Sequence, residues 1–542
     1  MEWCNEFSRE FLSRGYLLPG QTAEERLHII AQRAEAILGI YGFADKFLSN
    51  MSKGWYSLST PIWANFGTGR GLPISCFGSH ISDTMESILR TQAEVGMMTK
   101  LGGGTAAYFG DLRGRGALIG ENGVSSGAVH FMQLFETLLT VVSQGSTRRG
   151  NFAAYLPIEH HDVKEFLNIR TEGNAIQDTS FGVTVSDAWM NNMITGDKEN
   201  RDIWAKVIES RINTGYPYIL FTDNIKKGAP SVYSDMPIKS SNLCSEIMLP
   251  TNENESFVCD LSSMNILHYD DWKDTDAVQT LTYFLDAVMT EFINKAENIP
   301  YMDRAVTFAK RHRALGVGWL GWHSYLQKHR IPFESMTAKY HNAAIARNIQ
   351  ENTYAASEEL GKMFGCPLYL QGHNRRNSTL MAIAPTKSSS FILGQVSEGI
   401  EPNRTNYYIK DLQKGKYTIK NPYLENVLSD HSMNNTETWQ SIMQYGGSVQ
   451  HLDFLSDEER SVFKTFGEIT PKEIVIQAAQ RQKYIDQGQS LNLMIHPSIP
   501  VKDINALLIE TWKMGIKALY YQIGVNAAQQ FSRDILNCVS CE

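Results

Sequence analysis

Three polar side chains alternate in residues 241–250, SNLCSEIMLP, where Asn242, Cys244 and Glu246 precede an apolar run. If this segment is a strand, the three side chains share one face, because alternate residues of a strand point the same way. A thiol would then lie between a hydrogen-bonding amide and a carboxylate that could act as an acid or a base. The alternative is a buried cysteine in a strand with solvated polar ends, since free cysteine is among the most buried residue types.

Two further cysteines lie in short apolar segments, Cys76 in GLPISCFGSHISDT and Cys259 in SFVCDLSSMNI. Together with Cys244 they could converge at one barrel mouth. The seven cysteines belong to a chain that is too long to need disulfides for its stability, so each is explained by burial or by chemistry.

Composition indicates a soluble globular protein. The 542 residues are 42% hydrophobic and 20% charged, with a net charge of −8 and no long Lys/Arg run, so we expect small-molecule ligands and no nucleic acid. The charged N-terminus does not match a secretory signal, and no stretch approaches the roughly 18 apolar residues of a spanning helix. We therefore expect a cytoplasmic protein that does not bind membranes.

The elements that must position these groups alternate between helix and strand. A capping box from Thr22 to Glu25 begins an amphipathic helix over 22–38. The sequence predicts further helices over 83–98, 128–142 and 277–297, strands over 152–157, 181–186 and 216–221, and a glycine-rich ligand or subunit contact over 101–116. Such alternation favours a parallel α/β architecture in one large domain.

An ordered series of motifs resembles the large catalytic subunit of class I ribonucleotide reductase. The motifs are TPIWANFGTGRGLPISC (60–76), SQGSTRRG (143–150), SNLCSEIMLP (241–250), VCDLSSMN (258–265), RNSTLMAIAPTKSSS (376–390), EGIEPNR (398–404) and ALYYQ (518–522). The resemblance implies a ten-stranded α/β barrel over 66–527, with an effector site and dimer-forming helices. It would be preceded by a helical segment over 1–65 without an ATP-cone and followed by a flexible redox tail over 528–542.

The resemblance assigns a chemical role to each of these polar groups. Cys244 would carry a thiyl radical that takes the 3′ hydrogen of the ribose, Glu246 would be the general base on the 3′-hydroxyl, and Asn242 would bind the sugar hydroxyls. Cys76 and Cys259 would supply two electrons by closing a disulfide. Cys538 and Cys541, in CVSCE, would then reduce that disulfide and pass oxidation to thioredoxin or glutaredoxin. Half of a zinc site is the less favoured explanation of CVSCE.

The radical would come from a separate, metal-containing small (beta) subunit. Tyr520 and Tyr521 match stacked tyrosines that relay the oxidising equivalent, although an aromatic pair is more often core packing. Glu25 and His28 make only one E-x-x-H pair, so we expect no metal site and no cofactor on this chain.

Substrate and effector contacts follow from the same resemblance. The stretch 378–384 predicts a strand, and the hydroxyl-rich residues after it open a helix that could bind phosphate. The substrate-binding residues are Thr60, Ser75, Gly103, Pro385, Thr386, Lys387, Ser388 and Ser389. Asp83 and Arg113 would grip a nucleotide effector, a dNTP or ATP, at a homodimer interface. Diphosphates are expected as substrates because class I members use them.

Competing interpretations remain. GVGWLG (316–321) fits G-x-G-x-x-G, but no ribose-binding acid follows at the required spacing. An adenosylcobalamin-dependent reductase would share Cys76, Cys244 and Cys259 but would not need the tyrosine relay. The sequence is also compatible with a non-catalytic nucleotide-binding paralogue, or with a dithiol exchange protein built around CVSCE.

Overall fold

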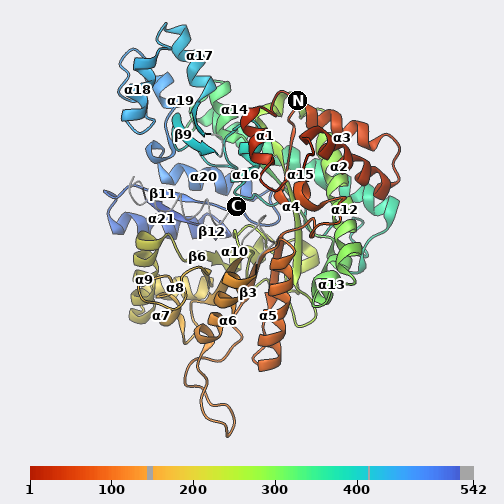
Figure 1. Cartoon of the computed structure of the whole chain (residues 1–542). Helices are drawn as coiled ribbons and strands as arrows, with labels where there is room; N and C mark the ends of the chain where they lie inside the picture. The colour runs from red at the N-terminus through yellow and green to blue at the C-terminus, as the bar shows by residue number, and fades with distance from the viewer. Residues whose placement is uncertain (143–149, 413–414, 525–542) are drawn as a thin grey trace.

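The computed structural model describes residues 1–142, 150–412 and 415–524. Five strands that follow one another along the chain form one half of the central sheet (Figure 1). Neighbours in this half are parallel, and helices connect them, as parallel strands require. The strands are β2 (Cys76–His80), β3 (Gly104–Tyr108), β4 (Asn151–Pro157), β5 (Ser180–Val185) and β6 (Tyr218–Phe221). The helices are α5 (Met85–Lys100), α6 (Ala128–Val141), α7 (Val163–Phe166), α8 (Asp187–Thr195), α9 (Lys198–Thr214) and α10 (Thr222–Lys227).

The second half of the sheet contains two regular strands, β7 (Phe257–Asn265) and β8 (Leu315–Leu320), which are parallel to each other. Three extended segments continue it, 379–383, 487–495 and 518–524. The last two contain the short strands β11 (Leu493–Ile495), β12 (Ala518–Leu519) and β13 (Gln522–Gly524).

Main-chain hydrogen bonds close these ten segments into a ring. Val317 N–H donates to the Leu380 carbonyl, Ile383 N–H to Gly488 and Tyr520 N–H to Leu491. The two halves meet in antiparallel pairs, β2 with β7 and β6 with β12. The expected ten-stranded α/β barrel is therefore confirmed, with some of its strands irregular.

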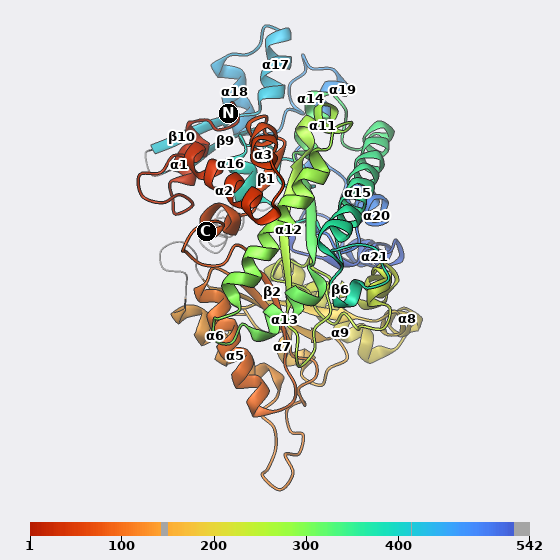
Figure 2. The ribbon, with the colours of Figure 1, turned by 90° about the vertical axis from the view of Figure 1, so that its right-hand side faces the viewer.

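Helices cover the second half of the barrel on the outside. In Figure 2, the long helices α12 and α15 run beside the sheet. The helices of this half are α11 (Tyr269–Trp272), α12 (Ala277–Ala296), α13 (Asp303–His312), α14 (Trp322–Lys328), α15 (Met336–Phe364), α16 (Lys387–Ile392), α20 (Pro471–Gln482) and α21 (Val501–Lys513).

The N-terminal helices pack on the same hydrophobic core as the barrel. They are α1 (Glu6–Leu12), α2 (Ala23–Leu38), α3 (Phe43–Ser52) and α4 (Thr60–Asn65), and the short strand β1 (Tyr56–Leu58) pairs with the end of β7. The predicted capping box is present, because Thr22 and Glu25 bond reciprocally at the start of α2.

An insertion between α16 and α20 has a small core of its own, which includes Trp439. It consists of β9 (Tyr407–Leu412), β10 (Gly415–Lys420), α17 (Pro422–Asp430), α18 (Thr436–Gln444) and α19 (Asp457–Val462), and it projects at the top of Figure 1. The described helices include none that is both long and apolar enough to cross a bilayer.

Two local predictions are corrected. Residues 241–250 form a turn and loop instead of a strand, with Ser245 at φ +66° and its N–H bonded to the Asn242 carbonyl. The glycine-rich stretch 101–116 contains the buried strand β3, so only part of it is a loop. The low weight given to GVGWLG as a dinucleotide site is confirmed, because most of it lies within β8, where its first two glycines pack closely against Ala382.

Candidate active site

The loop 241–250 lies inside the barrel, and Asn242 fixes its shape. The Asn242 Oδ1 atom accepts the N–H groups of Glu246 and Ile247 at 3.1 and 3.2 Å, and its carbonyl accepts the Tyr155 hydroxyl at 2.5 Å. The side-chain oxygen is therefore used by the loop itself. The Nδ2 group faces the Cys76 sulfur at 3.7 Å, so this N–H₂ is the part of Asn242 that a ligand could meet.

Cys76 and Cys259 are paired residues of adjacent antiparallel strands, β2 and β7. Directly opposed residues in such a pair have Cα atoms roughly 4.5 to 5.5 Å apart, which is within the range that a disulfide spans. Both cysteines are reduced in this structure, with Cys259 buried and Cys76 half-buried. Two thiols that can close a disulfide thus lie beside the loop that carries Cys244.

Gln487 connects the buried thiol to the loop. Its Nε2 group lies 3.3 Å from the Cys259 sulfur, and its Oε1 atom accepts the Met248 N–H at 3.0 Å. Burial raises the pKa of Cys259 well above its ordinary value, while the hydrogen bond from Gln487 opposes that rise. Cys259 is therefore a protonated thiol near neutral pH, which makes it a stored source of hydrogen and electrons.

Glu246 is fully buried beside the cysteines. Burial raises its pKa to about 7, although hydrogen bonds from its own loop and from Asn242 and Ser490 partly oppose the rise. A carboxyl group with this pKa exchanges protons readily near neutrality, as a general base in catalysis must. The Ser490 hydroxyl lies 3.0 Å from its Oε2 atom.

Two of the expected substrate-binding residues directly precede the strands β2 and β3. Ser75 directly precedes β2 and its carbonyl accepts the Gly104 N–H, while Gly103 lies beside it, where a Cβ atom would meet the Phe77 ring at 2.7 Å. Thr60 begins α4 and is half-buried. The structure thus explains why position 103 holds a glycine.

The predicted phosphate-binding residues form the turn between the extended segment 379–383 and α16. Thr386 has φ +57° and forms the N-cap of α16, and its hydroxyl accepts the Gly399 N–H at 2.7 Å. Pro385, Lys387, Ser388 and Ser389 are half-exposed. The predicted strand followed by a helix is present, although the helix is short.

Tyr520 and Tyr521 are in contact, with ring centroids 4.1 Å apart, and they belong to a larger aromatic cluster. Tyr218 lies 4.8 Å from Tyr520 and 5.3 Å from Tyr521, and the Tyr216 hydroxyl donates to the Tyr521 hydroxyl at 3.1 Å. The Tyr520 N–H bonds to Leu491, in the same segment that carries Gln487 and Ser490. The tyrosine pair therefore belongs to the barrel wall next to the cysteines.

Asp83 and Arg113, the expected effector contacts, are paired with each other. The Arg113 Nε group donates to the Asp83 Oδ2 atom at 2.6 Å, and the Arg113 main-chain N–H donates to Oδ1 at 3.2 Å. Both side chains are about one-third exposed. They lie near α5, away from the cysteines.

Some predicted residues fall outside the part of the chain that the structure describes. They are Cys538 and Cys541, together with most of the motif 143–150. Within the described ranges, no cluster of three or more His, Cys, Asp or Glu side chains is arranged to hold a metal ion.

Comparisons with known proteins show the family to which the chain belongs. The family model for the ribonucleotide reductase barrel domain matches residues 74–200, 191–371 and 368–522. The chain belongs to the ribonucleotide reductase family. A solved structure, the class Id ribonucleotide reductase alpha subunit of Actinobacillus ureae, aligns with a TM-score of 0.93 and 53% identity over 99% of both chains.

Sequence relatives agree with this assignment. A putative ribonucleoside-diphosphate reductase large subunit of Frog virus 3 is 35% identical over 500 residues, covering 88% of this chain and 87% of the relative. The large subunit of Danio rerio is 29% identical over 605 residues, covering 95% and 75% respectively. This ribonucleotide reductase is therefore an enzyme of the class I large-subunit type.

Sequence reasoning missed several residues of the reductase site. Gln487 and Ser490 come from the stretch DQGQS, which has no strand-like alternation, and Tyr155 comes from an unremarkable β4 pattern. Residues 486–492 are mostly polar, and only the structure shows that they are buried, so the sequence carried no signal for them.

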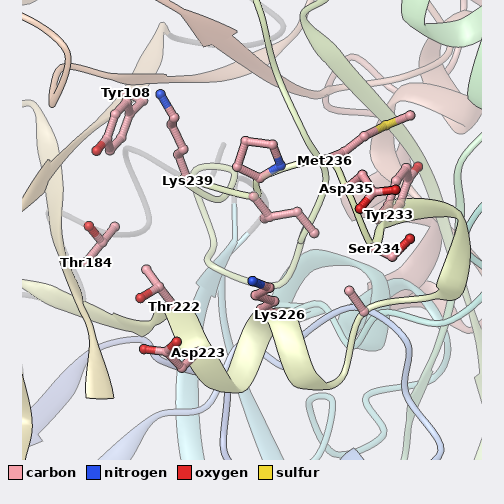
Figure 3. A pocket seen from close by; sticks show the side chains of 13 residues that line it. Tyr108, Thr184, Thr222, Asp223, Lys226, Tyr233, Ser234, Asp235, Met236 and Lys239 are labelled. Carbon is pink, nitrogen blue, oxygen red and sulfur yellow. The ribbon is translucent and has the colours of Figure 1, made fainter. Parts of the chain in front are cut away.

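A cavity of about 560 Å³ has none of the described cysteines in its lining (Figure 3). It lies at the carboxyl ends of β3, β5 and β6, with Tyr108, Thr184 and Thr222 in its wall, whereas Cys76 begins β2. Both lysines and aspartates line it, so it carries charges of both signs. The Lys239 ammonium is paired with Asp111 at 2.7 Å. The cysteine site is therefore kept as the candidate active site.

Proposed function

We propose that this ribonucleotide reductase large subunit converts ribonucleoside diphosphates to 2′-deoxyribonucleoside diphosphates by thiyl-radical chemistry. The observation that carries the proposal is the meeting of two groups inside the barrel. One is the opposed pair Cys76 and Cys259, and the other is the loop that presents Cys244 and Glu246.

The first step activates the ribose. The Cys244 thiyl radical takes the hydrogen atom from the 3′ carbon, which leaves a carbon radical and a Cys244 thiol. Glu246 accepts the 3′-hydroxyl proton, and its pKa of about 7 suits this exchange. The Asn242 N–H₂ group binds a sugar hydroxyl, since its Oδ1 atom is already engaged.

The second step removes the 2′-hydroxyl and balances the electrons. The hydroxyl leaves as water with a proton from the Cys76 and Cys259 pair. The two thiols give two electrons and two protons as they close a disulfide, and the substrate gains one hydrogen at the 2′ carbon. Cys244 then returns its hydrogen to the 3′ carbon and is a thiyl radical again. Glu246 returns its proton to the 3′ oxygen, which restores the 3′-hydroxyl and the ionised carboxylate.

We assign the remaining roles from the resemblance to class I large subunits. A radical-generating small subunit would oxidise Cys244 through Tyr521 and Tyr520. The redox tail over 528–542, with Cys538 and Cys541, would reduce the disulfide at the expense of thioredoxin or glutaredoxin. Asp83 and Arg113 would bind a dNTP or ATP effector in a homodimer. The barrel would span 66–527 and the N-terminal segment 1–65, and the free thiols suit a cytoplasmic location.

The phosphate-binding assignment rests on the turn at 385–389. Its half-exposed hydroxyls and Lys387 follow the segment 379–383, which is bonded to the strand that carries Ser490. A nucleotide held here by its diphosphate would extend its ribose toward the cysteines and toward Ser75, which directly precedes Cys76.

The experiment combines the full-length chain with a purified class I small subunit, a dithiol reductant and a ribonucleoside diphosphate. We expect deoxynucleotide formation that Cys244→Ser abolishes and Cys366→Ser, at a half-buried cysteine near α15, retains. Activity that persists in Cys244→Ser would refute the thiyl mechanism. Turnover with adenosylcobalamin and no small subunit would instead identify a cobalamin-dependent reductase, and a complete absence of turnover would favour a nucleotide-binding paralogue.

A further inference from the structure

Ser490 contacts both reactive positions of the loop. Its side chain is buried, and its hydroxyl lies 2.6 Å from the Cys244 carbonyl oxygen and 3.0 Å from the Glu246 Oε2 atom. Its main-chain N–H donates to the Ile383 carbonyl, which fixes Ser490 in the barrel wall. One side chain therefore joins the wall to the radical-bearing residue and to the base.

The number of hydrogens at this junction depends on the state of Glu246. A serine hydroxyl carries one hydrogen, and both a carbonyl and an ionised carboxylate can only accept. When Glu246 is ionised, the Ser490 hydrogen serves only one of the two contacts at a time. When Glu246 is protonated, its own O–H can donate to the Ser490 Oγ atom, and the Ser490 hydrogen is free for the Cys244 carbonyl. Both contacts are then hydrogen bonds.

The groups around Glu246 determine how much the Ser490 hydrogen bond affects its pKa. The titratable groups near it are Tyr155 on β4, Cys259 on β7 with its partner Cys76 on β2, and Cys244 on its own loop. Burial raises the pKa of Tyr155 and of Cys259, so both are neutral near pH 7. The groups that lower the pKa of Glu246 are hydrogen-bond donors and not cations.

We propose that Ser490 is a positioning residue that couples the protonation of Glu246 to the hold on Cys244, an inference that rests on the proposed function. When Glu246 takes the 3′-hydroxyl proton, the Ser490 hydroxyl donates its hydrogen bond to the Cys244 carbonyl. The loop is then held most firmly while the Cys244 thiol retains the hydrogen that it must return. When the proton leaves Glu246, the single Ser490 hydrogen is again divided between the Cys244 carbonyl and the Glu246 carboxylate.

The test measures the titration of Glu246 directly in the full-length chain, by infrared difference spectroscopy across pH. The Glu246 signal is identified by its loss in Glu246→Gln. We expect a wild-type midpoint near 7. In Ser490→Ala the midpoint should rise by about one pH unit, because the hydrogen bond from Ser490 lowers the pKa of Glu246. The charge-assisted bond that the ionised form loses outweighs the weaker, neutral bonds that the protonated form loses. Ser490→Thr keeps the hydroxyl and should restore the wild-type midpoint.

Ser245→Ala is the matched control. Ser245 lies in the same loop and is buried, but its hydroxyl has no hydrogen-bond partner among the described residues, so its removal should leave the midpoint unchanged. The acidic limb of kcat/KM for the complete enzyme should move with the infrared midpoint in Ser490→Ala. A purely structural role would change the rate without moving either pH midpoint.

The outcomes separate this inference from the proposed function. An active enzyme whose midpoint does not move in Ser490→Ala, or moves equally in Ser490→Thr, would overturn the role of Ser490 alone. A chain that shows the midpoint shift but never forms deoxynucleotides with a small subunit would overturn the proposed function, and the catalytic coupling would fall with it.

Discussion

Cys76 and Cys259 face each other across β2 and β7 as directly opposed residues of an antiparallel pair. Because this geometry spans a disulfide without movement of the backbone, we expect mild oxidation of the full chain to link these two residues. Peptide mass mapping after alkylation under denaturing conditions would detect the link. One turnover of substrate without reductant should produce the same link.

Variants make this prediction specific. Cys76→Ser and Cys259→Ser should each abolish the link and the multiple-turnover activity, because the second electron has no source. Cys366→Ser should abolish neither. A turnover-dependent disulfide between Cys244 and either partner, in place of the 76–259 link, would contradict the assignment.

Glu246 sets the second prediction, the pH dependence of the reaction. Burial raises its pKa to about 7, and only the ionised form can accept the 3′-hydroxyl proton. We therefore expect kcat/KM to fall as the pH drops below about 7, with a slope of one proton. Glu246→Gln should lower kcat by roughly 10² to 10⁴ and remove this limb. Full activity of the variant at pH 6 would refute the base role.

Asp286 provides a prediction about stability. This buried carboxylate on α12 bonds to Arg313 and Arg376 at 2.8 Å and accepts the Asn377 amide at 3.0 Å. Because Asn377 leads into the barrel segment 379–383, the network anchors one strand of the active site. Asp286→Asn leaves two buried guanidinium groups without their counter-charge, so we expect a loss of about 3 to 5 kcal/mol in urea unfolding.

The pH dependence of this contribution has a defined sign. Burial alone would raise the pKa of Asp286, but the charges and hydrogen bonds of Arg313 and Arg376 lower it below its ordinary value. Its stabilisation is therefore complete above the ordinary aspartate pKa and is lost as the pH falls through the lowered one. Asp276→Asn, at an exposed ion pair with Lys46, should cost only about 0 to 1 kcal/mol. Equal losses in both variants would contradict the network.

The sequence predicted the barrel and the convergence of its cysteines better than it predicted local geometry. Helix α2 follows from its capping box and apolar spacing, because both signals are local. The loop at 241–250 was predicted as a strand because its alternation resembles one. In the structure, Tyr155 and the Asn242 amide impose a turn, and these contacts come from distant parts of the chain or depend on a φ of +66° at Ser245.

The irregular strands illustrate the same limit. Residues 487–492 are buried and belong to the barrel, but their polar side chains hide this from any hydrophobic pattern. Two of these polar residues contact the candidate site: Gln487 bonds to Cys259 and Ser490 bonds to Glu246. Their partners Cys259 and Glu246 are more than 200 residues away in the sequence, so no local rule could pair them.

Tyr520 and Tyr521 carry the last prediction, because their rings are 4.1 Å apart beside the segment that holds Ser490. Tyr520→Phe and Tyr521→Phe keep the ring packing but remove the O–H that a radical relay oxidises, so activity with the small subunit should fall to the assay background. Tyr216→Phe is the matched control. It removes the same hydrogen bond to Tyr521, worth about 1 kcal/mol of stability, and leaves both relay hydroxyls in place. Deoxynucleotide formation and urea unfolding would be measured on all three variants. If Tyr216→Phe were as inactive as Tyr521→Phe at equal stability, the hydrogen bond and not the relay would explain the loss.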